Sequence, residues 1–295
     1  DAVTSVAEQV ESPRRLGAIT VTAQKREQSL QDVPIVVTAL SGELLSDAGV
    51  QDIKDLTVVT PGLLVTSSSK QANTTARIRG IGTVGDNPGL ESSVGVVVDG
   101  VPRARNGVSF GDLGEIERIE VLKGPQGTLF GKSTSAGVIN VVTKKPSDEL
   151  ETIFEVGIGN ENFLRTSGEI TGPLSETVSG RLFGVYEERG GLLDVRTGNG
   201  PRTEEETSQY DFYSVRGQLL IEPSGDLEVL LSADYTDREE DCCMGDYISV
   251  DPARGPLITL LAGGDGASAF PTDPYDRVAF ANRDATQTTE DWGVS

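Results

Sequence analysis

From residue 148 onward the chain is built from segments of about ten residues in which apolar and polar side chains alternate. A period of two is the signature of a β-strand with two chemically different faces. One set of alternate positions is apolar or small: Leu150, Thr152, Phe154, Val156, Ile158, Leu164, Thr166, Gly168, Ile170, Val178, Gly180, Leu182, Gly184, Tyr186, Tyr213, Val215, Gly217, Leu219, Ile221, Leu227, Val229, Leu231, Ala233 and Tyr235. The positions between them are mostly polar. The pattern predicts five antiparallel strands and the start of a sixth near Thr289.

Two architectures use such strands, a soluble β-sandwich and a membrane-spanning barrel. Here the connections are short around Asn160 and 172–177, long over 189–209, short at 223–226 and very long over 238–288. Tight turns at one end and long loops at the other are typical of a membrane barrel. The sandwich stays as the alternative. Six strands cannot close a wide lumen, and an open edge in lipid leaves backbone groups unpaired, so we expect part of a longer chain.

The charge is uneven along the 295 residues, whose net charge is −21. Residues 1–147 hold 15 cationic and 16 acidic side chains, whereas residues 148–295 hold 10 and 30. This acidity argues against a nucleic acid as partner. No apolar run approaches the roughly 18 residues of a spanning helix. No charged-then-apolar signal opens the chain, which suggests the mature start of an exported protein. The chain has no histidine, so we predict no catalytic centre and no cofactor. Glu239, Glu240, Asp241, Asp246 and Asp251 offer carboxylates for a divalent cation, but their spacing fits no calcium loop, and we interpret them as a solvated acidic loop and predict no metal site.

Residues 117–146 place a glycine-rich segment between two β-branched runs, which predicts a strand, a compact loop and a second strand. Gly131-Lys132-Ser133-Thr134 looks like the end of a phosphate-binding loop, but Gln126 stands where that loop needs its first glycine. The glycines at 80, 82 and 85 fit a dinucleotide-binding pattern, yet Pro88 follows and no helix can open there. We interpret both glycine sets as structural.

In this order, residues 117–146 closely resemble the last segment of the plug domain of TonB-dependent outer-membrane receptors. The resemblance begins at about Ala18 and implies a mixed fold. An N-terminal tail (1–29) would precede an α+β plug with a four-stranded sheet (30–147). The first five strands and the start of the sixth of an antiparallel transmembrane β-barrel would follow (148–295), from a barrel of 22 strands in the family. The expected plug strands are 76–82, 94–102, 119–122 and 138–143, and the expected helices are 41–48 and 52–59.

The resemblance also implies a function. Such a plug closes a barrel that imports a scarce solute, such as an iron–siderophore complex or another large nutrient, when a TonB-type partner pulls on the plug. The tail and plug base would face the periplasm and the long loops the outside, with outer-membrane lipid around the barrel. Siderophore, carbohydrate, cobalamin and aromatic compound all stay open as ligands. The alternative is a secreted or surface adhesin or carbohydrate-binding protein without transport, and a passive porin is disfavoured because the plug would block it.

The resemblance assigns a TonB box to Ile19, Thr20, Val21, Thr22 and Ala23. These β-prone residues follow a polar tail, which suits a free segment that adds as a strand to the edge of a partner's sheet. An ordinary first strand of the plug is the alternative.

Two further sets of residues follow from the resemblance. The loop apices at 67–75, 83–92 and 103–110 would touch the ligand, unless they are only solvated loop tips. Their candidate contacts are Lys70, Gln71, Asn73, Asn87, Arg103, Arg105 and Asn106. Cations in the strands would lock the plug to carboxylates of the barrel wall, most of which we expect beyond Ser295. They are Arg77, Arg79, Arg118 and Lys123. Arginine is frequent at position 123 in the family, and a lysine there cannot form the bidentate pair that an arginine forms with a carboxylate.

Cys242 and Cys243 are the only cysteines and are adjacent in the chain. An exported protein meets oxidising conditions, which favours a disulfide. Their Cα atoms are about 3.8 Å apart, below the usual range, so the bridge would be strained. We predict a vicinal disulfide in a surface loop, with free or intermolecular thiols as the alternative.

Overall fold

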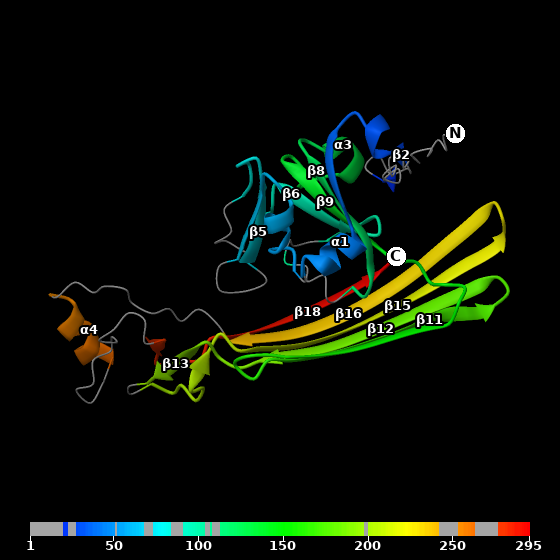
Figure 1. The fold of residues 1–295 in the computed structure, drawn as a ribbon. Coiled ribbons are helices and arrows are strands. Elements are labelled where there is room, and N and C mark those ends of the chain that lie inside the picture. Colours follow the sequence, from blue (N-terminus) through cyan, green and yellow to red (C-terminus); the bar gives the residue numbers. More distant parts are fainter. Residues whose placement is uncertain are drawn as a thin grey trace, which may run out of the picture.

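The computed structural model describes residues 20–22, 28–50, 52–67, 73–83, 91–103, 107, 113–197, 200–241, 253–262 and 277–295. An N-terminal unit, residues 28–143, lies against one face of a sheet of long strands, as Figure 1 shows. We call this second sheet the wall sheet. Its strands are β10 (Glu151–Ile158), β11 (Leu164–Ser175), β12 (Val178–Arg189), β15 (Tyr210–Ser224), β16 (Leu227–Asp241) and β18 (Thr286–Val294).

The N-terminal unit is organised around a mixed five-stranded sheet. Its order is β3 (Val36–Ser41), β8 (Ile116–Lys123), β9 (Gly137–Thr143), β6 (Val94–Val98) and β7 (Val101–Arg103). The β6–β9 pair is parallel and the other pairs are antiparallel. The predicted α+β fold with strands near 94–102, 119–122 and 138–143 is therefore confirmed.

The prediction of a four-stranded sheet that includes residues 76–82 is wrong in its detail. Strand β5 (Thr74–Ile78) pairs instead with β4 (Leu63–Ser67) in a separate hairpin. The chain turns sharply after β5, because Arg79 and Gly80 both adopt positive φ and Ile78 bridges Ile81. Strand β3 occupies the sheet edge beside β8.

The described residues of the unit also form three short helices and one 3-10 turn: α1 (Gly42–Asp47), α2 (Leu56–Val59), α3 (Gly127–Phe130) and η1 (Leu30–Asp32). The predicted cap of the first helix is present, since the Ser41 Oγ accepts a bond from the Leu44 N–H at 3.3 Å. The second helix is shorter than expected, because residues 53–55 form a turn before it. The glycine-rich loop holds α3, a single turn that the sequence did not predict.

Buried aliphatic side chains fill both faces of the mixed sheet. The larger cluster lies between the sheet, α1, α2 and the β4–β5 hairpin, and includes Ile53, Leu56, Ile78, Ile119 and Ile139. The smaller cluster, on the opposite face, contains Val21, Val97, Leu122, Phe130 and Val138. Val21 belongs to the N-terminal strand β1 (Thr20–Val21), so a residue outside the compact unit takes part in its core.

The wall sheet is antiparallel throughout, in the order β10-β11-β12-β15-β16-β18. Short turns join β11 to β12 and β15 to β16, whereas long connections follow β12 and β16, as predicted. The described parts of the long connections lie beyond one end of the wall sheet (Figure 1). They contain β13 (Leu193–Arg196), β14 (Glu206–Thr207), β17 (Val278–Phe280) and α4 (Gly255–Ala262), and the three strands form the small sheet β14-β13-β17.

The two faces of the wall sheet differ as the alternation predicted. The face toward the N-terminal unit carries the polar set, including Glu169, Arg181, Arg216, Gln218 and Asp234, which contact that unit. On the opposite face the leucines of the alternate set are exposed, and four aromatic residues form a row across neighbouring strands. These residues are Tyr186, Tyr213, Tyr235 and Trp292; Tyr186 pairs with Tyr213 and Tyr235 with Trp292.

Candidate functional site

The described N-terminal residues, Thr20 to Thr22, are docked on the N-terminal unit. Thr20 and Val21 pair antiparallel with Ser29 and Gln28 of β2 (Gln28–Ser29). The Val21 side chain is fully buried in the smaller core cluster. The expectation of a free segment is therefore wrong for Thr20, Val21 and Thr22 in this structure. Ile19 and Ala23 lie outside the described residues.

A buried carboxylate anchors the end of this segment. The Glu120 side chain is fully buried in β8, and its Oε1 accepts bonds from the Thr22 N–H at 2.7 Å and the Thr22 hydroxyl at 3.1 Å. The Arg118 Nε donates to the same oxygen at 2.9 Å. The Asn140 amide of β9 donates to the Glu120 Oε2 at 3.2 Å and to the Thr22 hydroxyl at 3.1 Å. These bonds compensate the burial of the charge.

The cations predicted to lock the N-terminal unit to the wall sheet make different contacts. Arg118 pairs within its own unit, with Glu117 and Glu120. Lys123 donates to the Pro61 carbonyl at 2.7 Å. Arg77 and Arg79 make no ion pair with any residue that the structure describes. The locking role of Arg118 and Lys123 toward these six strands is therefore not supported.

A chain of alternating charges joins the two units instead. Arg103, at the end of β7, makes a bidentate pair with Asp234 of β16 at 2.8 and 2.9 Å. Asp234 also pairs with Arg216 of β15. Arg216 in turn pairs with Asp99 in the β6–β7 turn. Asp99 in turn accepts bonds from the Thr143 N–H and hydroxyl, both at 2.8 Å. The side chains of Arg103, Asp234, Arg216 and Asp99 are only 3–13% exposed.

The environment of Arg103 favours its charged form. Burial alone would lower its pKa, but the hydrogen bonds and charge of Asp234 outweigh that effect and raise the pKa of Arg103. The guanidinium predicted to contact a ligand is therefore already paired with the wall sheet.

A second contact lies where the chain passes from one unit to the other. Arg181 of β12 pairs with Glu169 of β11 and with Glu115, and it donates to the Lys145 carbonyl at 3.1 Å. Lys144 pairs with Glu115 at 2.8 Å. Burial alone would raise the pKa of Glu115. The hydrogen bonds and charges of Lys144 and, to a smaller extent, Arg181 outweigh this effect, so the pKa of Glu115 lies below its ordinary value. Lys145 adds an exposed pair with Glu228.

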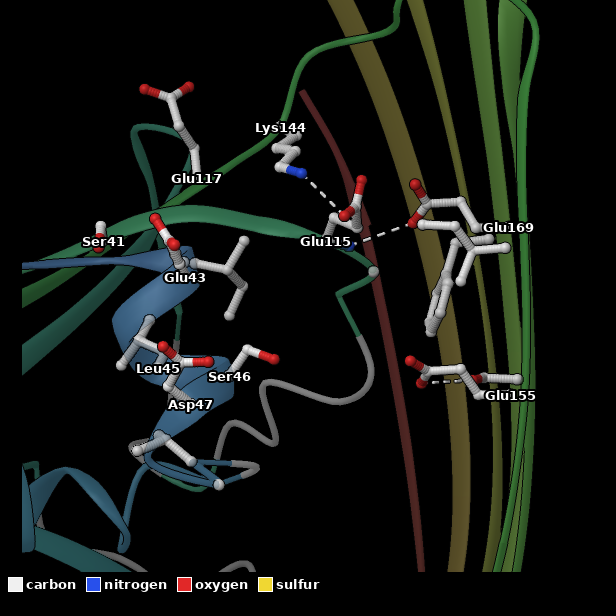
Figure 2. Close-up of a pocket in the computed structure, with 18 of the residues that line it drawn as sticks. Ser41, Glu43, Leu45, Ser46, Asp47, Glu115, Glu117, Lys144, Glu155 and Glu169 are labelled. Carbon is white, nitrogen blue, oxygen red and sulfur yellow. Dashed lines mark hydrogen bonds and ion pairs between the residues drawn. The ribbon is translucent and has the colours of Figure 1, made fainter.

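A cavity of about 750 Å³ separates α1 from β10, β11 and β12. Figure 2 shows Glu43, Ser46 and Asp47 of α1 on one side and Glu155 and Glu169 of the wall sheet on the other. Glu115 and Lys144 close its end. Acidic side chains predominate in this lining, so an anion would be repelled from this space. Among the described residues there is no cluster of His, Cys, Asp and Glu suited to hold a metal ion.

The other predicted ligand contacts are largely outside the description. Asn73 lies next to the start of β5 and is partly buried. Lys70, Gln71, Asn87, Arg105 and Asn106 fall outside the described residues, as do Cys242 and Cys243. Their predicted roles stay predictions.

Arg103 was selected from the sequence, as a ligand contact, but five other residues that join the two units were not. They are Asp99 and Glu115 of the N-terminal unit with Arg181, Arg216 and Asp234 of the wall sheet. The alternation places three of them, Arg181, Arg216 and Asp234, in the polar set. It therefore predicted the side of the sheet on which they lie, but not the residues that they contact. Asp99 adopts a φ of 48° in a two-residue turn, a conformation that aspartate tolerates better than most residues.

Residues 29–138 match the family model of the TonB-dependent receptor plug domain. The pesticin receptor of Yersinia pestis is 32% identical over 287 residues, covering 93% of this chain and 39% of the receptor. The solved structure of the ferric yersiniabactin uptake receptor from Yersinia pestis matches with a TM-score of 0.62 and 26% identity, over 70% of this chain and 32% of that one. The ferripyoverdine receptor of Pseudomonas aeruginosa, solved with ferripyoverdine, shares the fold at 20% identity with a TM-score of 0.64, over 93% of this chain and 34% of that one.

The chain thus spans 39% of the length of this curated relative. No helix in the described part of the chain is long and apolar enough to cross a membrane. The match to the pesticin receptor extends over 93% of the chain, so it covers the N-terminal unit and continues into the wall sheet. The chain belongs to the TonB-dependent receptors, of which it carries the plug domain and part of the β-barrel.

Proposed function

We propose that this chain is the plug and first wall of an outer-membrane receptor that actively imports a scarce solute. The observation that carries the proposal is the position of the N-terminal unit. It sits on the polar face of a sheet whose other face is apolar, and buried ion pairs hold it there. A barrel closed by such a unit needs an energy-transducing partner to move it, which distinguishes an importer from a passive pore.

The orientation follows from the outer face of the wall sheet. In the aromatic row, Tyr186 and Tyr213 lie three residues from the ends of β12 and β15 that carry a long connection. Tyrosine and tryptophan concentrate at membrane–water interfaces, and outer-membrane barrels keep their long loops outside. The short turns and residues 20–22 would then face the periplasm, and outer-membrane lipid would cover the leucines between.

The partner would be a TonB-type protein that pairs with residues 19–23. Strand addition needs an extended segment with a regular side-chain pattern, and Thr20 and Val21 already adopt a strand. Here that strand is engaged with β2 and Glu120, so pairing with the partner would require its release.

The ligand class we favour is an iron chelate. The relatives are named for pesticin, ferric yersiniabactin and ferripyoverdine, two of which are iron complexes. The apices at 67–75, 83–92 and 103–110 would provide the contacts, with Arg105 as the cation for an anionic group. Arg103 is paired with Asp234, so its part in binding would be indirect. We expect no enzymatic activity.

Replacing Val21 with proline in the full-length receptor tests the coupling. Proline removes a backbone donor and resists strand pairing, so uptake of the ferric chelate should be lost while its binding persists. Growth on the chelate as sole iron source and equilibrium binding to isolated outer membranes measure the two properties.

The matched control is Val21→Ile, which keeps the backbone donor and the β-branched side chain. It should transport normally. Growth of the Val21→Pro strain at the wild-type rate would show that the TonB-binding segment is misassigned.

A further inference from the structure

Glu120 is a fully buried carboxylate that has no part in the proposed import function as described above. It lies in the central part of β8, on the face that carries the smaller core cluster, away from the cavity beside α1. A buried carboxylate is costly unless its lone pairs are filled. Of the four donor bonds that it accepts, two come from Thr22, a residue nearly one hundred positions earlier in the chain.

The bonds of Glu120 engage a backbone group that strand addition would need. A segment that adds to a partner's sheet offers its own N–H and C=O groups along its length. In this structure the Thr22 N–H donates to the Glu120 Oε1 at 2.7 Å, while Thr20 and Val21 are paired with β2. The Val21 side chain is enclosed among Val97, Leu122, Phe130 and Val138. Residues 20–22 are thus held through their backbone and their side chains.

Arg118 and Asn140 orient the carboxylate toward the segment. The Arg118 Nε bonds the Glu120 Oε1, and the Asn140 amide bonds both the Glu120 Oε2 and the Thr22 hydroxyl. Both residues project from β8 and β9, the central strands of the mixed sheet, so the receiving group is fixed before the segment docks.

We propose that Glu120 is a positioning residue that holds residues 20–22 on the N-terminal unit and thereby competes with the pairing of this segment to a TonB-type partner. The inference rests on the proposed function, because it takes residues 19–23 to be the partner's strand. The N-terminal unit and the partner would compete for the same backbone groups of residues 20–22. The buried charge of Glu120 would determine how strongly the N-terminal unit retains the segment.

The experiment replaces Glu120 with glutamine in the full-length receptor in lipid nanodiscs. Glutamine keeps the shape and one accepting oxygen but loses the charge and one acceptor. A hydrogen bond to a charged acceptor stabilises more than one to a neutral acceptor. Amide exchange at Thr22 should therefore be about tenfold faster in the Glu120→Gln variant than in the wild type. The affinity for the purified periplasmic domain of the TonB-type partner should rise by a similar factor.

Glu117→Gln is the matched control. Glu117 also pairs with Arg118, but its side chain is 46% exposed and it contacts no residue of the 20–22 segment among those described. This variant should leave exchange at Thr22 and partner affinity unchanged. Asn140→Ala, which removes two bonds but keeps the carboxylate, provides a second variant in case Glu120→Gln does not fold, and it should accelerate exchange by a smaller factor.

Wild-type exchange rates in both Glu120→Gln and Asn140→Ala would overturn the inference and leave the import function intact. Faster exchange without a gain in partner affinity would equally overturn the competition. Failure of the partner to bind the wild-type receptor or any variant would instead contradict the proposed function.

Discussion

Arg103 illustrates how tertiary contacts redirect a residue that the sequence alone presents as a loop cation. It is the first residue of the 103–110 apex, which the resemblance predicts to contact the ligand, but in the structure its guanidinium is bidentate with Asp234 across the two units. Fork-to-carboxylate pairs are the strongest side-chain hydrogen bonds, and this one is shielded from water. Arg103 therefore joins the apex to the wall sheet.

A double-mutant cycle on Arg103→Ala and Asp234→Ala should give a coupling energy of about 2 kcal/mol, because the pair is charge-assisted and largely buried. The measurement is the unfolding free energy of the detergent-solubilised receptor. Lys132 and Glu91 provide the control pair, whose side chains are 83% and 60% exposed. Their coupling should be well under about 1 kcal/mol. Equal values for the two pairs would contradict a buried lock.

Strand β8 is the element that connects the contacts of the N-terminal unit. Glu115, just before the strand, accepts bonds from Lys144 and Arg181, and Glu120 within it holds Thr22. Its neighbour β9 leads directly into Lys144, which pairs with Glu115, and Lys145, which pairs with Glu228 of the wall sheet. One hairpin therefore touches both the wall sheet and the N-terminal segment.

Glu115 should make the junction sensitive to acid. Because its folded pKa lies below the ordinary value of 4.5, its stabilising contribution is present above that value and is lost as the pH falls through the folded pKa. Glu115→Gln should therefore lower the melting temperature at pH 7, and the difference from wild type should disappear in acid, at a pH below the folded pKa of Glu115.

Glu43→Gln serves as the reference variant, since Glu43 lines the same cavity and is exposed. It should melt like wild type at both pH values. A Glu115→Gln deficit that persisted in acid would mean that shape, and not charge, is what the junction requires.

At the scale of the whole molecule, the chain places its acidic, polar and apolar surfaces in separate regions. The polar face of the wall sheet receives the N-terminal unit, the opposite face exposes leucines, and the long connections extend beyond one end (Figure 1). A sheet of this kind is stable with its apolar face in lipid, where charged side chains are costly at mid-depth.

Two leucines on the outer face of β16 test this arrangement. Leu231 lies near the middle of the apolar band and Leu227 next to the short turn, and they are 48% and 52% exposed. Leu231→Arg should destabilise the folded barrel in bilayers by about 2–4 kcal/mol, whereas Leu227→Arg should cost about 0–1 kcal/mol. Reversible unfolding from lipid vesicles measures both, and equal costs would indicate that this face meets water.

The sequence by itself determined the features that local periodicity and turn chemistry encode. Alternation over 150–235 predicted five of the six strands of the wall sheet and the face of the residues within them, because a strand places successive side chains on opposite sides. The order of glycine-rich and β-branched segments over 117–146 determined the family. The Ser41 cap was also readable, since it depends on residues within one helical turn.

Only the tertiary structure decided which charges meet and which strand occupies a sheet edge. Arg103 and Asp234 are separated by 131 positions, and Thr22 and Glu120 by 98, so no local pattern relates them. Strand β3, and not β5, lies at the edge of the mixed sheet. Arg79 and Gly80 adopt positive φ and turn the chain away from this sheet after Ile78. Long-range pairing depends on the packing of whole elements, and packing is decided by the complete set of buried side chains.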